Sequence, residues 1–391
     1  MDSGFFRSHI LEDLIPFWMN AGLDTQHGGF FRPRDRAGRK LDRETKSSSR
    51  HGRMIYGFSV AYGLSKDAAY LDAAKQGVSF LVHNFWDHRY SGWYRQIRSS
   101  GPAIDTNKRA FDQAYVLSGL VEFFRITQDR EVWSYIQASL DVLEEFFWDR
   151  EFSGYYETLT REWQFESDQK TVCDQLDVMG SFLLLCRLDK SAEQMQNLRR
   201  IADLIVSRML DEKYGCVLET FSRHWSYYPW RTRDRLLFGH NLKAVWQLAE
   251  AHSLTGESTY LQTARRLLDY CLQNAWDRDH GGFYQHGYRN GRLASDEKEW
   301  WSVSEGMSAL LFMHRETQNP RYLEFFDKTA RFALAHLFDP QYGEWFWACH
   351  ADGRVKNDRK TDAYHSIQAC LHAHELLRYR GDEAAAREEI L

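Results

Sequence analysis

The sequence predicts an all-helical toroid of six repeats, an (α/α)6 barrel. A short motif of one or two glycines among aromatic residues occurs six times, at intervals of 61 to 67 residues. Each interval has room for two helices of about 12–18 residues and a short hairpin. Six helix pairs can close as an inner and an outer ring, so we expect one domain over residues 1–391, with a polar tail at about 381–391.

The glycine motif itself predicts a small β-hairpin between helices. Asn290-Gly291 and Asp352-Gly353 follow two of the copies, and such dipeptides favour tight hairpin turns. A charged turn at residues 34–38 follows the first copy in the same way. The copies lie at residues 26–31, 90–94, 152–156, 280–284 and 342–346, with a weaker one at 214–217.

The rest of each repeat has helical rather than strand periodicity. Apolar residues recur at helical spacing over residues 114–124, 201–209 and 260–272. Sustained alternation of polar and apolar residues, which would predict long strands, is not seen. These segments therefore favour the helix pairs of the barrel.

Composition and charge exclude several classes of function. The net charge is −5 and no basic run stands out, so we expect no nucleic-acid partner. No segment approaches the roughly 18 apolar residues of a membrane span, and the N-terminus does not resemble a signal peptide. The six cysteines form no CxxC pair, which predicts reduced thiols in a cytoplasmic protein. Exposed helices of the outer ring offer a surface for a homodimer.

Polar residues gather where each repeat begins an apolar helix, some 16 to 25 residues after its glycine. Equivalent segments of six repeats converge at one mouth of a barrel, so these side chains should surround a binding site. Aromatic residues make up 15% of the chain, and they suit both core packing and stacking on sugar rings. The ring consists of His51, Arg53, Lys108, Phe111, Asp112, Gln113, Asp174, Gln175, Asp177, His240, Asn241, Lys243, Trp300, Trp301, Ser302, Ser304, Glu305, Tyr364, His365, Ser366 and Gln368.

The chemistry of this ring favours proton transfer. Histidine is the side chain whose ordinary pKa suits acid and base catalysis near neutral pH. A single histidine is often a buried structural residue, but His240 and His365 occupy similar places in two repeats. No HExxH motif, cysteine cluster or phosphate-binding glycine loop is found, so we expect no metal and no other cofactor.

These residues resemble the N-acylglucosamine 2-epimerase superfamily, which includes cellobiose 2-epimerases, mannose 2-epimerases and mannose-type aldose–ketose isomerases. The resemblance covers nearly the whole chain, from the segment at residues 15–18 to His365, and it implies the same (α/α)6 barrel. Its most specific matches are His51-x-Arg53, Gly239-His240, Trp300-Trp301 with Glu305, and Tyr364-His365.

The resemblance implies roles for individual residues. His240 and His365 would be the two acid–base histidines, and Arg53 would polarise the sugar oxygen at C1 or C2. Trp300 and Trp301 would stack on the sugar. Other predicted contacts with the small sugar substrate are His51, Phe111, Asp112, Gln113, Asp177, Ser181 and Glu305.

Two positions depart from the family pattern. Many members have a glutamate three residues after the first histidine, where this chain has Lys243. A cation beside His240 would lower its basicity unless a carboxylate intervenes or Lys243 points away. Many members also have a third histidine where this chain has Ser181.

Four functions remain open at the level of sequence. The leading one is a 2-epimerase acting on a free reducing sugar, either mannose and glucose or their N-acylated amino forms. The second is an aldose–ketose isomerase of the mannose–fructose type. The third is a glycoside hydrolase, for which Asp112, Asp177 and Glu305 are candidate carboxylates. The fourth is an inactive sugar-binding homologue.

Overall fold

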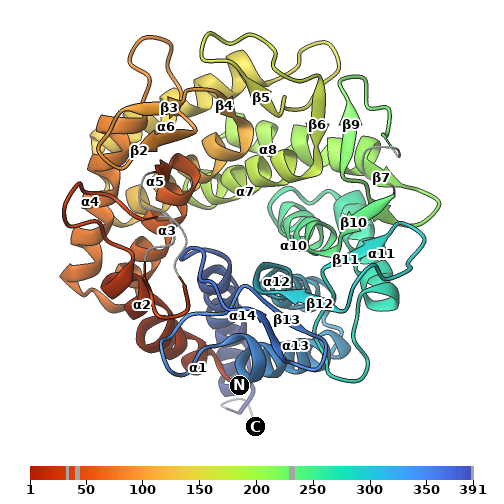
Figure 1. Cartoon of the computed structure of the whole chain (residues 1–391). Coiled ribbons are helices and arrows are strands. Elements are labelled where there is room, and N and C mark those ends of the chain that lie inside the picture. The colour runs from red at the N-terminus through yellow and green to blue at the C-terminus, as the bar shows by residue number, and fades with distance from the viewer. Residues whose placement is uncertain (32–34, 40–44, 229–233, 389–391) are drawn as a thin grey trace.

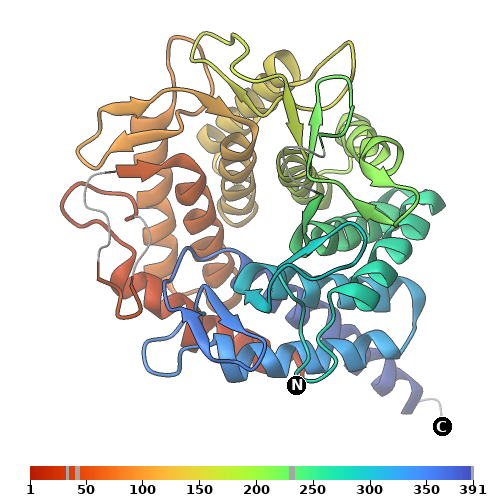
Figure 2. The same ribbon diagram turned by 45° about the vertical axis from the view of Figure 1, so that its right-hand side comes forward.

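The computed structural model describes residues 1–31, 35–39, 45–228 and 234–388. These residues form a ring of helices, with short strands around one rim (Figures 1 and 2). The inner helices are α3 (Ser48–Ser65), α5 (Ala110–Thr127), α7 (Val172–Leu188), α10 (Phe238–Thr255), α12 (Trp300–Thr317) and α14 (His365–Glu388). Each inner helix contacts the next, and α14 returns to α3. The predicted (α/α)6 barrel is confirmed.

The outer ring alternates with the inner ring along the chain. Three of its helices end in a widened π turn just before the hairpin. Its elements are α1 (Ser3–Ser8), η1 (His9–Leu14), α2 (Ile15–Ala21), α4 (Ala68–Phe85), α6 (Arg130–Val142), η2 (Leu143–Phe147), α8 (Ala192–Leu204), η3 (Ile205–Met209), α11 (Ser258–Asn274), α13 (Arg321–Phe332) and η4 (Ala333–Leu337). The N-terminal helix α1 packs on α14 and closes the ring.

Sequence sets the boundary between an inner helix and the outer helix that follows it. Inner helix α5 is followed by the capping residue Gln128, which has a φ of 56°, and α10 is followed by Gly256, which has a φ of 74°. The outer helix then starts within a few residues. Asp129 caps α6 by accepting hydrogen bonds from its first backbone amides. These signals explain why the two helices run antiparallel through a tight connection.

The two rings differ in how they are buried. Inner helix α10 is buried continuously from Phe238 to Ala251, as expected of a helix surrounded by others. Outer helices such as α11 bury one face and expose the other. Among the described residues, no helix has the length and apolar character needed to cross a membrane.

Each glycine motif closes a hairpin of the same size, as the sequence predicted. The pairs that close it are Leu23–Phe30, Trp86–Trp93, Trp148–Tyr155, Leu210–Val217, Trp276–Phe283 and Phe338–Trp345. Gly92 and Gly154 adopt φ values of 77° and 86°, a left-handed conformation that glycine adopts without strain.

The named strands are short, and most of their pairings join neighbouring repeats. They are β1 (Thr45–Ser47), β2 (Gln96–Arg98), β3 (Ala103–Asp105), β4 (Lys108–Arg109), β5 (Thr158–Leu159), β6 (Gln169–Thr171), β7 (Leu210–Asp211), β8 (Cys216–Val217), β9 (Thr220–Ser222), β10 (Arg235–Leu237), β11 (His286–Tyr288), β12 (Glu297–Glu299), β13 (Ala348–His350) and β14 (Val355–Asn357). The sheets are β1-β2-β3, β4-β5, β6-β9, β7-β8, β10-β11 and β12-β13-β14, and their pairs are antiparallel.

A buried lysine–aspartate pair fastens most hairpins to the start of an inner helix. The lysine also donates to a hairpin carbonyl, as Lys298 does to Gly281 at 2.7 Å. The pairs and their N–O distances are Lys46–Asp24 (3.0 Å), Lys108–Asp87 (3.1 Å), Lys170–Asp149 (2.9 Å), Lys298–Asp277 (2.6 Å) and Lys360–Asp339 (3.2 Å). Lys108 is therefore part of this fastening and not a ligand of the mouth.

The chain ends are partly described. Helix α14 extends through most of the segment that the sequence analysis assigned to a polar tail. Residues 389–391, like Arg34 of the predicted first charged turn, lie outside the described residues. All six cysteines are free thiols, and five of them are buried.

Candidate active site

A cavity of about 160 Å³ lies at the mouth where the inner helices begin. Its lining comes from all six inner helices and one residue beside β13. The lining residues are Arg53, Phe111, Tyr115, Cys173, Asp177, His240, Lys243, Trp300, Trp301, Trp347 and His365. The N-terminal ends of helices carry partial positive charge, so the mouth favours negative charge that develops in a bound molecule.

A wider hollow, of about 520 Å³, lies at the C-terminal ends of the inner helices. Two of its charged groups, Arg187 and Glu250, form an ion pair with each other. Arg187 donates to both carboxylate oxygens of Glu250, at 2.5 and 2.9 Å. Arginine at a helix C-terminus also offsets the partial negative charge there. The smaller cavity, with histidines and tryptophans around it, is the better candidate for chemistry.

His240, in the first turn of α10, is held by a carboxylate from the preceding loop. Its Nδ1 lies 2.7 Å from Oε2 of Glu219, whose other oxygen accepts the backbone amide of Leu237 at 2.8 Å. Burial alone would lower the pKa of His240, but the Glu219 carboxylate outweighs it and the pKa is raised. The imidazole is therefore favoured in its protonated form.

His365, the first residue of α14, has the opposite character. Its Nδ1 lies 3.0 Å from Oε1 of Glu305, and Trp246 fixes the other oxygen of that carboxylate with a 2.5 Å hydrogen bond. Burial lowers the pKa of His365, and Glu305 offsets this only in part. The imidazole is therefore favoured in its neutral form, which is the form that can accept a proton.

Arg53 supplies a permanent positive charge to the cavity. Its Nη1 lies 2.9 Å from Asp362, and its guanidinium lies 3.8 Å from the centre of the Tyr115 ring. Burial would lower the pKa of Arg53, but Tyr115, Asp362 and Asp177 raise it above its ordinary value. Arg53 is thus able to stabilise an oxyanion in the cavity.

Lys243, the first departure from the family pattern, lowers the pKa of His240, but this effect is outweighed by Glu219. Its ammonium pairs with Oδ1 of Asp177 on α7. Burial would raise the pKa of Asp177, but Lys243 and then Arg53 lower it, so the carboxylate stays ionised. The carboxylate beside His240 comes from Glu219, whereas many family members have a glutamate at the position of Lys243.

Several residues predicted from sequence do not line the cavity. His51 accepts the backbone amide of Phe30 at 3.0 Å and donates to the carbonyl of Ser47 at 2.9 Å. Gln113 bonds the amide and carbonyl of Trp93 in the same way. Their predicted contact with the sugar is corrected, because their polar atoms satisfy hairpin backbone groups that are otherwise unpaired.

Ser181, Asp112 and Glu305 also lie behind the lining. Ser181 hydrogen-bonds Ser118 and the carbonyl of Ala114 between helices. Asp112 is buried, and burial raises its pKa. Glu305 reaches the cavity only through His365. These three predicted sugar contacts are corrected to supporting positions, whereas Phe111, Asp177, Trp300 and Trp301 do line the cavity.

Five residues of the site were not predicted from sequence: Tyr115, Cys173, Trp347, Glu219 and Asp362. A signal existed for Tyr115. It lies seven residues after the buried Lys108, the same interval that separates Arg53 and Asp177 from Lys46 and Lys170. Glu219 and Trp347 share a repeat position, since each lies two residues after the closing residue of its hairpin, Val217 or Trp345. Asp362 lies in the segment before α14.

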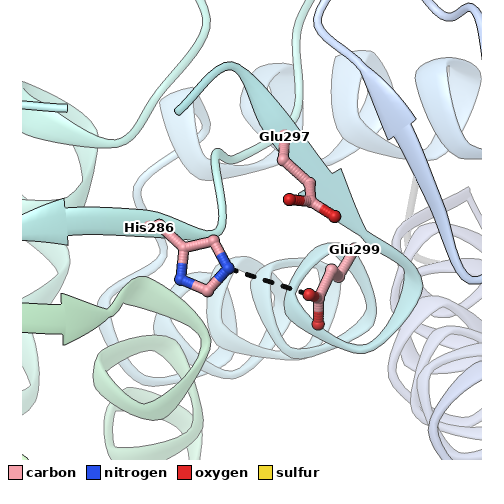
Figure 3. Close-up of side chains that lie close together, drawn as sticks. All are labelled: His286, Glu297 and Glu299. Atoms are coloured by element: carbon pink, nitrogen blue, oxygen red, sulfur yellow. Dashed lines mark ion pairs between the residues drawn. The ribbon is translucent and has the colours of Figure 1, made fainter. Parts of the chain in front are cut away.

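One group of described residues has the composition of a metal site. His286, Glu297 and Glu299 place ligand atoms within 4.8 Å of one another at the start of α12 (Figure 3). Both carboxylates already have partners, since Lys356 pairs with Glu297 at 2.8 Å and Trp301 donates to Glu299 at 2.6 Å. Within the cluster, Glu299 holds the Trp301 ring, whose centre lies 5.2 Å from that of His240.

Comparison with known proteins defines the class of enzyme. The cellobiose 2-epimerase of Bacteroides fragilis is 25% identical over 92% of this chain and 95% of its own length. The D-mannose isomerase of Marinomonas mediterranea is 22% identical over 94% and 95%. The structure of cellobiose 2-epimerase from Bacillus thermoamylovorans shares the fold, with a TM-score of 0.87 and 23% identity over 95% of this chain and 98% of that one. The chain is an enzyme of the sugar epimerase and isomerase class.

The family follows from the match along the chain. The model of the N-acylglucosamine 2-epimerase (GlcNAc 2-epimerase) family matches residues 28–369. The chain belongs to this family.

Proposed function

We propose that the enzyme epimerises a free reducing sugar at C2 by proton removal and return between two histidines. The observation that carries this proposal is the opposite protonation preference of His240 and His365 around one cavity. Epimerisation needs a base on one face of the substrate carbon and an acid on the other. A neutral and a protonated imidazole, each fixed by its own glutamate, meet that need.

In one direction His365 removes the proton at C2 of the open-chain aldose. Negative charge then develops on the carbonyl oxygen at C1, where Arg53 stabilises it. His240 delivers its proton to the opposite face of C2, which inverts that centre. The reverse direction exchanges the two roles, and solvent resets the protonation of both imidazoles after product release.

The alternatives differ in what they require of the same cavity. An aldose–ketose isomerase returns the proton at C1 and needs one base, and a D-mannose isomerase is among the relatives. A glycoside hydrolase needs a carboxylic acid at the bond it breaks. Within the described lining the carboxylate is Asp177, whose pKa is lowered beside Lys243, so it is unsuited to donate a proton.

Proton NMR in deuterated water tests the proposal, with mannose, glucose, N-acetylmannosamine and cellobiose as separate substrates. We expect loss of the C2 proton signal and growth of the C2 epimer, abolished in His365→Asn. A His83→Asn variant is the matched control, because His83 is exposed and outside the cavity. A ketose product would establish the isomerase instead, and no exchange with any sugar would reject both.

A further inference from the structure

We infer that the Lys243–Asp177 ion pair binds two neighbouring free hydroxyls of the substrate, those at C3 and C4. The enzyme would then select a hexose that is unsubstituted at these positions. The inference rests on the proposed function, because the histidines and Arg53 must occupy C1 and C2 for the pair to meet the next two carbons.

The position of the pair supports this role. Lys243 lies one turn beyond His240 on α10, about 4.5 Å further along the helix axis. Asp177 lies on the neighbouring α7, and both side chains line the cavity. The pair therefore lies beside His240 but further along the helix. The carbons C3 and C4 would likewise lie beside C2 but further from His240.

A buried ion pair of this kind destabilises the fold unless further hydrogen bonds compensate for the loss of hydration. Lys243 and Asp177 are 6% and 5% exposed, and removing two charges from water costs several kcal/mol for each ion. The hairpin pairs compensate by binding backbone carbonyls, as Lys298 does. Lys243, by contrast, hydrogen-bonds Asp177 and, at 3.5 Å, the Tyr115 hydroxyl among the residues that the structure describes. Its remaining donor capacity is available to a molecule in the cavity.

The chemistry of the pair matches adjacent hydroxyls. An ammonium donates to one hydroxyl oxygen while the carboxylate accepts the proton of the neighbouring hydroxyl. Asp177 retains this capacity beside its contacts with the Tyr115 hydroxyl and, at 3.4 Å, the thiol of Cys173, because its two carboxylate oxygens offer about four acceptor positions. A sugar linked through O4 has no proton to give. The cavity volume of about 160 Å³ is also below the roughly 300 Å³ lower bound of pockets for larger ligands.

Deoxy sugars and a charge-neutral double variant test the inference together. The variant is Lys243→Met with Asp177→Leu, since apolar replacement of a buried ion pair often preserves stability. A second variant, Lys243→Gln with Asp177→Asn, keeps polarity if the first does not fold. In the wild type, 3-deoxy and 4-deoxy mannose should lose about 10- to 100-fold in kcat/KM relative to mannose, mainly through KM. In the double variants, 3-deoxy and 4-deoxy mannose should have the same kcat/KM as mannose. The control is 6-deoxy mannose, whose kcat/KM relative to mannose should be the same in the wild type and in both double variants.

Calorimetric binding of the same sugars separates this inference from the proposed function. If the wild type exchanges no C2 proton, the proposed reaction fails, but the subsite still predicts weaker binding of the 3-deoxy and 4-deoxy sugars by the wild type alone. Equal penalties in wild type and double variants, in turnover or in binding, would overturn the subsite. Turnover of cellobiose at the rate of mannose would overturn it as well.

Discussion

Replacing Glu219 by glutamine tests whether the Glu219 carboxylate raises the pKa of His240, the proposed acid. Glutamine has nearly the same shape and keeps one acceptor oxygen, for either His240 or the amide of Leu237, but it replaces the other oxygen by an NH2 donor and removes the charge. The contact is 2.7 Å long, and the two side chains are 10% and 13% exposed. A hydrogen bond to a charged group contributes about 1.5–3 kcal/mol, which corresponds to a shift of about 1–2 pKa units. Glu219→Gln should therefore lower the pKa of His240 by about that amount.

The consequence is visible in the pH dependence of turnover. Activity in one direction needs His365 neutral and His240 protonated, so kcat/KM should follow a bell-shaped profile whose alkaline limb belongs to His240. In Glu219→Gln this limb should move about 1–2 pH units toward acid, and kcat/KM at pH 8 should fall about 10- to 100-fold. Epimer formation is followed by NMR from pH 5 to pH 9. Glu305→Gln is the matched comparison, because it removes the carboxylate beside His365 instead.

Stability gives an independent check with a defined sign. The folded-state pKa of His240 is raised. Its pairing therefore stabilises the fold below the unfolded pKa of about 6.5, and this contribution is lost as pH rises through the folded value. Denaturant unfolding should show a larger deficit of Glu219→Gln at pH 6 than at pH 9. An unchanged alkaline limb, or a stability deficit that grows with pH, would refute the assignment of Glu219 as the group that charges His240.

Three further outcomes are expected. His240→Asn should still exchange the C2 proton with deuterated water through His365 while epimer formation falls about 10²- to 10⁴-fold, and equal loss of both signals would contradict the two-histidine scheme. Asp277→Asn should lower the free energy of unfolding by about 3–5 kcal/mol at pH 7, because Lys298 is left buried and unpaired, whereas the exposed Asp352→Asn control should not. The pKa of Asp277 is lowered, so this deficit should be complete above the unfolded-chain pKa near 4 and should shrink as pH falls below it through the lower pKa of the folded state. Trp301→Ala should raise KM about tenfold or more through lost stacking on the sugar, as measured by initial rates, and an unchanged KM would place Trp301 outside the substrate contacts.

Seven of the residues predicted from sequence for the site lie around the cavity. Arg53, Phe111, Asp177, His240, Trp300, Trp301 and His365 all line the cavity, as the repeat alignment anticipated. The alignment erred for His51 and Gln113, because the same helix starts also carry the side chains that bond the hairpin backbone. Position in a repeat brings both kinds of residue to the mouth. The direction of the side chain and its hydrogen-bond partners then distinguish a residue that lines the cavity from one that bonds the hairpin backbone.

The repeat of glycine hairpins and helix pairs determined the architecture, because local periodicity and turn chemistry recur six times and leave one way to bury every inner helix. What the tertiary structure decided is the electrostatics of the cavity. Glu219 comes from a loop between strands, and Asp177 reaches Lys243 from a different helix across 66 positions of sequence. The pKa of each histidine depends on such neighbours within a few ångströms and on the water excluded around them. Sequence spacing carries no record of those distances, so the opposite pKa shifts of His240 and His365 follow only from the closed ring of helices.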